Sequence, residues 1–188
     1  MAVNKVVTFI EGNIAKFAKA FAKEVHKSKY LNRYKGFTEE ELISRNEKVF
    51  KKLTEFLEDK LPGKEVGRFF VKIGKERYKE GFPLCEVIYA LYLTKNIFWK
   101  KIREEGFFSS ALDVYVAMET LKSIYDFFDV GAIYIIRGYE EEMYQELGQT
   151  GKLSEDDLKK VFFPGSFKND ELVIKSTYKN IPFFDWKW

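Results

Sequence analysis

Few side chains in this sequence could carry out chemistry, and each of them also has a purely structural interpretation. The one histidine, His26, lies in a lysine-rich stretch, and its sequence neighbours offer no catalytic partner. General-base catalysis requires such a neighbour, and nothing else in the sequence supports haem ligation. We therefore interpret His26 as a surface histidine.

A group of carboxylates near residue 140 could in principle hold metal ions. It consists of Glu140, Glu141, Glu142 and Glu146. Dinuclear metal sites in helical bundles carry a Glu-x-x-His motif on two helices, and the sequence has no such motif. We interpret the carboxylates as a solvated acidic face, and we expect no metal, no other cofactor and no enzymatic activity.

Cys85 is the only cysteine, so an internal disulfide or a metal site built from several cysteines is excluded. It falls in the first turn of a predicted helix, a position that permits a redox role. Apolar neighbours and the lack of a second thiol favour a buried structural cysteine instead. Cysteine usage, the absence of a secretory signal and the absence of a long apolar run predict a cytoplasmic protein.

Basic side chains are concentrated in the middle of the chain. The net charge is only +3 overall, but it is +4 for residues 1–63, +6 for 64–103 and −7 for 104–188. The main concentration of basic residues, on the predicted third and fourth helices, consists of Lys72, Lys75, Arg77, Lys79, Lys95, Lys100, Lys101 and Arg103. We favour a solvated helix surface, with an anionic ligand, an acidic partner or a nucleic-acid backbone as alternatives.

Apolar residues recur every three or four positions throughout the chain, which is typical of amphipathic helices. The second stripe, for example, consists of Leu42, Asn46, Val49, Leu53, Phe56 and Leu57. The pattern predicts helices over about 3–28, 39–61, 64–80, 83–105 and 111–147, and a short helix after residue 154. With 46% apolar residues, we expect one all-α bundle of five to six helices over residues 1–163, followed by an irregular aromatic tail over 164–188.

Local signals indicate how these helices begin, end and meet. Thr38 and Glu41 are spaced as a capping box, which places the start of the second helix at Glu39. The corner at 81–83, Gly-Phe-Pro, ends the third helix and begins the fourth. Glycines within the third helix, Gly67 and Gly74, suggest close contact with a neighbouring helix or a bound group. The fourth helix is aromatic on nearly all sides, so we expect it to be central.

The last six residues are mostly aromatic, and two interpretations remain open. The side chains concerned are Phe183, Phe184, Trp186 and Trp188. A free tail of this kind would bind a partner through Trp186 and Trp188, because tryptophan anchors interfaces disproportionately. We favour a tail that folds back over the bundle and completes its core.

Over residues 34–147, the order of these features resembles the N-terminal domain of RsbT co-antagonist (RsbRD-type) proteins, a helical module also found ahead of bacterial sensor histidine kinases. The matching pieces include Tyr34, the segment 37–42, and a Gly-x-x-Arg-x-x-x-Gly-x-x-Leu pattern at Gly74, Arg77, Gly81 and Leu84. The resemblance implies a non-catalytic sensor domain that acts in bacterial signal transduction or protein interaction. It supplies no catalytic residues.

Our first hypothesis is therefore a signal-input module that binds a regulatory protein partner or a small-molecule ligand, with a long helix suited to homodimerisation. The alternative is a carrier or sensor that holds a hydrophobic or tetrapyrrole-like molecule between helices three to five. In that case Arg77, Tyr78 and Tyr89 are the candidate polar groups of the pocket. Nucleic-acid binding is the least expected function.

Overall fold

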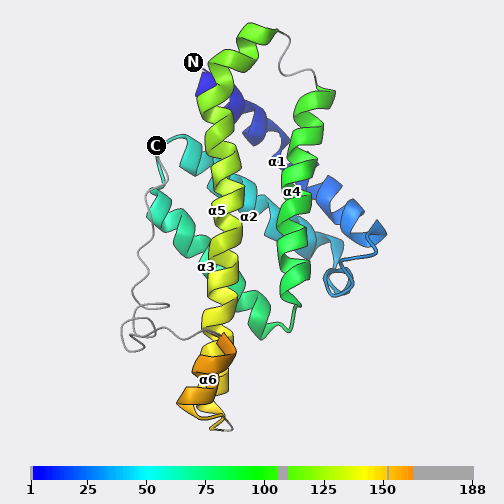
Figure 1. Ribbon diagram of the computed structural model, residues 1–188. Helices are drawn as coiled ribbons and strands as arrows, with labels where there is room; N and C mark the ends of the chain where they lie inside the picture. The colour runs from blue at the N-terminus through cyan, green and yellow to red at the C-terminus, as the bar shows by residue number, and fades with distance from the viewer. Residues whose placement is uncertain (1, 106–109, 152, 163–188) are drawn as a thin grey trace.

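The computed structural model describes residues 2–105, 110–151 and 153–162, and every regular element in these residues is helical (Figure 1). The elements are α1 (Ala2–Lys27), the 3-10 turn η1 (Tyr34–Gly36), α2 (Glu39–Leu57), α3 (Gly63–Lys79), α4 (Leu84–Glu104), α5 (Ala111–Gln149) and α6 (Glu155–Phe162). The predicted all-α bundle with one long helix is confirmed. The predicted tail over 164–188, with Trp186 and Trp188, lies outside the described residues.

The helix ends follow the local signals of the sequence. The Thr38 side chain accepts a hydrogen bond from the Glu41 amide at 3.2 Å, and the Glu41 carboxylate accepts one from the Thr38 amide at 2.8 Å. This capping box starts α2 at Glu39. At the end of α3, Gly81 adopts a φ of 72°, and the Phe82 amide donates to the Arg77 carbonyl at 3.0 Å. That geometry is a Schellman motif, which only a residue tolerant of positive φ accommodates easily.

The helices pack most extensively as two pairs, α1 on α2 and α3 on α5. Figure 1 shows α5 running the length of the molecule, with α4 beside it. α5 contacts each of the other five α-helices. The prediction that α4 is central was therefore wrong; the central helix is α5, and α4 exposes the side chain of Tyr92.

The core is a single cluster of apolar side chains drawn from α1 to α5. Aromatic rings dominate it, which accounts for the high aromatic content. The Phe17 ring lies 4.8 Å from Phe50 and 5.9 Å from Phe98, between centroids. A second group joins α3 to α5, where the Phe70 ring lies 5.1 Å from Phe127.

α3 and α5 cross at backbone contact, and glycines make this possible. A Cβ atom added at Gly74 would lie 2.1 Å from the Ile135 carbonyl oxygen, and one added at Gly138 would lie 2.1 Å from the Val71 carbonyl oxygen. Each helix thus has a glycine at the point where the backbone of the other helix approaches it. The predicted close contact of Gly74 with a neighbouring helix is confirmed.

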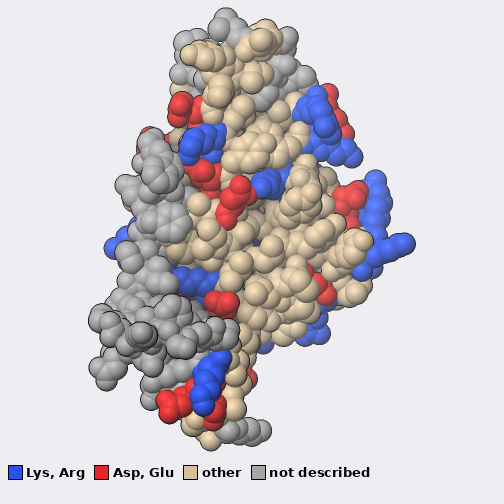
Figure 2. Space-filling view, viewed as in Figure 1, with Lys and Arg blue, Asp and Glu red and all other residues tan. Residues whose placement is uncertain are grey.

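The outer side of α5 remains partly apolar. Large exposed side chains along it include Tyr115, Met118, Tyr125 and Ile133. Figure 2 shows uncharged side chains over most of the face formed by α4 and α5. A helix that is apolar on nearly all sides has more apolar surface than one contact face can cover.

Candidate functional site

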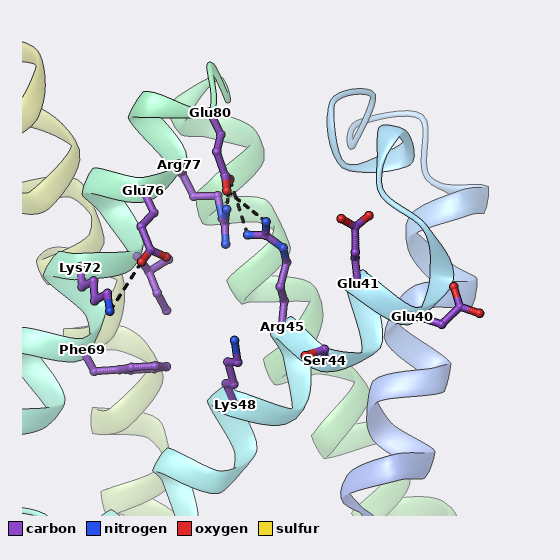
Figure 3. Close-up of a pocket in the computed structure, with 11 residues that line it drawn as sticks. Glu40, Glu41, Ser44, Arg45, Lys48, Phe69, Lys72, Glu76, Arg77 and Glu80 are labelled. Carbon is purple, nitrogen blue, oxygen red and sulfur yellow. Dashed lines mark hydrogen bonds and ion pairs between the residues drawn. The ribbon is translucent and has the colours of Figure 1, made fainter.

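A groove of about 610 Å³ lies between α2 and α3, where the two helix pairs meet (Figure 3). Both cations and carboxylates line it. The cations are Arg45, Lys48, Lys72 and Arg77, and the carboxylates are Glu40, Glu41, Glu76 and Glu80. Such a lining suits a polar ligand or a polar segment of a partner better than a purely apolar molecule.

Glu80 joins the two walls of the groove. Its carboxylate accepts a hydrogen bond from the Arg45 Nη2 of α2 at 3.0 Å, and it also pairs with Arg77 on α3. Figure 3 shows both guanidinium groups converging on it. Arg77 is buried, and burial lowers the pKa of its guanidinium from the ordinary value. Its charge is stabilised by the pair with Glu80, by Tyr34 and by the nearby carboxylate of Glu76.

Three aromatic rings lie behind this ion pair, and we call them the aromatic hub: Tyr34, Phe37 and Phe82. Tyr34 and Phe82 are 4.6 Å apart between ring centroids, and Phe37 stacks on Phe82 at 5.3 Å. The Arg45 guanidinium lies 4.1 Å from the centroid of the Phe37 ring, a favourable cation–π geometry. Burial raises the pKa of Tyr34 to about 12, although the nearby arginines act in the opposite direction.

The hub lies where the predicted corner between α3 and α4 meets the α1–α2 connection. The Arg33 amide donates to the Glu86 carboxylate of α4 at 2.9 Å, and the Arg33 guanidinium donates to the Glu80 carbonyl at 3.0 Å. From α5, the Tyr139 hydroxyl donates to the Phe82 carbonyl at 2.8 Å. The corner therefore connects both helix pairs at one end of the groove.

A smaller recess of about 60 Å³ lies against the same wall. Arg45, Ile73 and Arg77 line both the groove and the recess. The remaining lining is mostly apolar, with the hydroxyl of Tyr34 and the polar side chains of Asn46 and Thr94 as exceptions. The groove and the recess are thus neighbouring spaces that share one boundary.

The predicted ligand residues have different surroundings. Arg77 lines the groove. Tyr78 packs edge-on against Tyr139 of α5 at 5.1 Å, and burial together with a hydrogen bond to Glu146 raises its pKa to about 12. Tyr89 lies between the rings of Tyr30 and Tyr92, at 5.4 and 6.0 Å. Neither tyrosine lines the groove or the recess.

Sequence reasoning missed Arg45, Asn46 and Glu80 as site residues. Glu80 follows Arg77 by three positions, the spacing of neighbours on one helix face. Asn46 interrupts the apolar stripe of α2, and a polar residue at a core position is the one local signal that could have drawn attention to it. For Arg45, the only cue was its place beside that stripe.

Two other predictions need correction. Cys85 is exposed and not buried, because it faces outward from the first turn of α4. Glu141 is buried and not part of a solvated face, since it pairs with Lys75 of α3 and Arg137 of α5, each at 2.8 Å. His26 is exposed, as expected. Among the described residues, no group of three or more His, Cys, Asp or Glu side chains is placed to hold a metal ion.

The basic middle segment and the acidic end of the chain largely face each other. Lys75 and Lys79 of α3 pair with carboxylates of α5, the latter with Glu142 at 3.0 Å, and Lys95 of α4 pairs with Asp129. These pairs compensate much of the charge that could otherwise bind a nucleic-acid backbone. The opposite net charges of the two segments therefore have a structural cause.

The chain matches the model of the RsbT co-antagonist protein rsbRD N-terminal domain over residues 13–152, and it belongs to that family. The family is one of regulatory domains, and the match covers most of α1, all of α2 to α5, and with them the groove and the hub. It confirms the resemblance and extends it at both ends. No curated protein and no solved structure matches the chain. Within the described residues, no helix is long and apolar enough to cross a bilayer.

Proposed function

We propose that this chain is a non-catalytic signal-input module of a bacterial regulatory system, and that it recognises a ligand or a regulatory partner in the groove between α2 and α3. Membership of a regulatory family supports the general role. The observation that carries the site is the bridge from Arg45 through Glu80 to Arg77, which spans the groove and joins the two helix pairs.

A ligand or partner bound in the groove would be placed to change how the helices pack against each other. α3 and α5 are fixed to each other by backbone contact, whereas α2 reaches α3 at only a few points and through side chains. A group that competes for Glu80 or for Arg45 would alter how α2 sits on the α3–α5 pair. Small shifts between packed helices are a common way in which regulatory proteins transmit a signal.

The tetrapyrrole carrier is less well supported. Pockets for drug-sized ligands measure about 300–1,000 Å³ and are mostly apolar. The described recess beside α3, α4 and α5 measures about 60 Å³, and the groove is lined by charges. The expectations of a homodimer and of a cytoplasmic location stay predictions that accompany this proposal.

The proposal can be tested in the organism that carries the gene, by reversing two exposed charges in the groove. Lys48→Glu combined with Lys72→Glu should reproduce the transcript changes caused by deleting the gene. Lys72 and Glu76 form an exposed i,i+4 pair at 3.8 Å, so the change should have little effect on stability.

The matched control is Lys64→Glu combined with Lys100→Glu, outside the groove. Lys100 forms an equivalent exposed i,i+4 pair with Glu104, also at 3.8 Å. This control should behave as the unchanged protein does. A groove variant with normal abundance and normal transcripts would contradict the assigned site. Turnover of a substrate by the purified protein, lost on removing one polar groove residue, would contradict the non-catalytic role.

A further inference from the structure

One lysine of the groove, Lys48 of α2, has no carboxylate to pair with. Side chains three and four positions apart on a helix are neighbours, and the four neighbours of Lys48 are Ser44, Arg45, Lys51 and Lys52. None of these is acidic. Lys51 and Lys52 each pair with a glutamate of α2, whereas Lys48 forms no ion pair with any described residue. Because the Lys48 side chain is exposed in the groove, its ammonium group is available to a bound anion.

The other cations of the groove also outnumber the carboxylates beside them. The guanidinium groups of Arg45 and Arg77 share the single carboxylate of Glu80. Lys72 and Glu76 form an exposed pair at 3.8 Å. Two carboxylates thus face three cations here, and the unpaired lysine of α2 adds a fourth.

The remaining carboxylates of the lining lie at the start of α2. Glu40 and Glu41 belong to its first turn. The Glu41 carboxylate accepts a hydrogen bond from the Thr38 amide at 2.8 Å, and Figure 3 shows Glu40 pointing away from α3. The stretch of the groove between Arg45 and Lys48 on α2 and the facing turns of α3 therefore has a surplus of positive charge. A concave site of this kind attracts anions.

Apolar side chains of α3 form the opposite wall of this stretch. Phe69 and Ile73 line the groove and are only partly buried. They are four positions apart on α3, so they share one helix face. Figure 3 shows the Phe69 ring directed toward Lys48 across the groove. An accessible ring opposite an unpaired ammonium group suits a molecule with an anionic group and an apolar body.

From this arrangement we infer that the groove binds a small organic anion. Its charged group, a carboxylate or a phosphate, is held by Arg45 and Lys48 on one wall and by Lys72 on the other. Its apolar body packs on Phe69 and Ile73. The volume of about 610 Å³ lies within the range of about 300–1,000 Å³ that is usual for small-molecule sites. The inference deepens the proposed function and rests on it for the signalling role, because an anion held by both helices would strengthen the contact of α2 with α3.

Benzoate and benzamide form a matched pair of probes, because they share their size and their ring but only benzoate is charged. Each would be titrated into the isotope-labelled chain of 188 residues while amide NMR shifts are recorded. Benzoate should give saturable shifts at Arg45, Lys48, Phe69 and Lys72, with a dissociation constant near about 1 mM. Benzamide should bind at least about tenfold more weakly, because it cannot form charge-assisted hydrogen bonds as an anion.

Two further probes separate the parts of the ligand. Acetate keeps the charge but has no ring, so it should bind at least about tenfold more weakly than benzoate. Phenyl phosphate should also bind, and the tighter of the two aromatic anions identifies the charged group. Equal binding of benzoate and benzamide would overturn the inference, as would the absence of a saturable shift in the groove with both aromatic anions. Equal binding of acetate and benzoate would refute the apolar contact.

Variants test the assigned residues. Lys48→Met keeps the length of the side chain but removes its charge, so it should weaken benzoate binding at least about fivefold. Lys51→Met is the matched control, because Lys51 is also exposed on α2 but lies outside the groove. It should bind benzoate as the unchanged protein does. Phe69→Leu should weaken the binding of benzoate more than that of acetate. Unchanged benzoate affinity in Lys48→Met would refute the role of Lys48.

The inference and the proposed function can fail separately. Selective benzoate binding, together with normal transcripts in the groove variants, would retain the anion site and reject the regulatory groove. Altered transcripts in those variants, without binding of either aromatic anion, would retain the regulatory groove and reject the organic anion. A protein partner would then be the occupant to test.

Discussion

The two sides of α3 differ in how they are held. Towards α5, the contact is made by backbone atoms, because at Gly74 and Gly138 the backbone of the opposite helix occupies the space where a side chain would stand. Towards α2, the contact is made across a groove by Arg45 and Glu80 and by the rings of the aromatic hub. One side is fixed by shape, and the other by charges and hydrogen bonds.

This difference indicates which contact can respond to a signal. A backbone crossing has one good arrangement, because close-packed groups cannot be compressed or shifted cheaply. An ion pair across a groove can be exchanged for a ligand or a partner with a similar charge. We therefore regard α3 and α5 as one body and α2 as the element that can move against it.

The largest effect is expected at the crossing of α3 and α5. Gly74→Ala places a Cβ atom 2.1 Å from the Ile135 carbonyl oxygen, which is backbone and cannot rotate away. Overpacking of this kind should lower the free energy of unfolding by about 3 kcal/mol or more. Urea unfolding followed by circular dichroism would measure it.

Gly12→Ala is the matched control, because it lies on α1 with no heavy atom within 4 Å of the added Cβ. That substitution should raise stability by about 0.5–1 kcal/mol, as expected for glycine replaced by alanine in an open helix position. If Gly74→Ala were as harmless as Gly12→Ala, the crossing would not be the rigid contact.

The next largest loss of stability is expected when the ion pairs of the groove are broken. Glu80→Gln keeps the shape of the side chain but removes the charge that pairs directly with the buried Arg77, which then has only the more distant carboxylate of Glu76. Breaking a fully buried ion pair costs about 3–5 kcal/mol, and the Glu80 side chain is 35% exposed, so we expect a loss of about 2 kcal/mol in unfolding free energy. Glu76→Gln, at an exposed pair on the same helix, should change stability by less than about 0.5 kcal/mol. Equal effects of the two would show that Glu80 does not bridge the helix pairs.

Much of the fold could be predicted because its signals are local. The Thr38 capping box and the Gly81 corner each depend on a few adjacent residues, and both are present as predicted. The role of Gly74 was also visible, since a glycine inside a helix costs stability and so indicates a close neighbour. Periodicity could not show which helix is central, because both α4 and α5 are apolar on nearly all sides.

The candidate site was less predictable because it depends on residues far apart in the chain. Arg45 and Glu80 are 35 positions apart, and Asn46 and Thr94 are 48 apart. Sequence reasoning grouped Arg77, Tyr78 and Tyr89 as polar groups of one pocket, whereas the structure directs these side chains to different neighbours. Cys85 and Glu141 were misjudged for the same reason, since their exposure is decided by the packing of other helices.

A smaller loss of stability is expected from the aromatic hub when the pH is raised. Burial raises the pKa of Tyr34 to about 12, against about 10 in the unfolded chain. The folded state thus holds the phenolic proton more tightly, and the resulting stability is complete below about pH 10 and is lost as the pH rises towards 12. Between pH 9 and pH 11 the loss should be about 1.4 kcal/mol.

Tyr34→Phe isolates this contribution, because the other titrating groups are common to both proteins. Urea unfolding at pH 9 and pH 11 should show a smaller decrease for the variant than for the unchanged protein. Tyr115→Phe, at a strongly exposed position on α5, should leave the decrease unchanged. Identical pH dependence in all three proteins would mean that Tyr34 is not buried as a neutral phenol.

The smallest change in the free energy of unfolding is expected at the recess, and it is informative whether this change is a gain or a loss of stability. Asn46→Leu removes the unpartnered Oδ1 and fills apolar space, while Thr94 keeps its bond to the Ala90 carbonyl. Replacing a poorly satisfied buried polar group by an apolar one of similar size should leave stability unchanged or raise it by up to about 1 kcal/mol. If urea unfolding instead showed a loss above about 2 kcal/mol, Oδ1 would already have a strong partner such as a tightly held water.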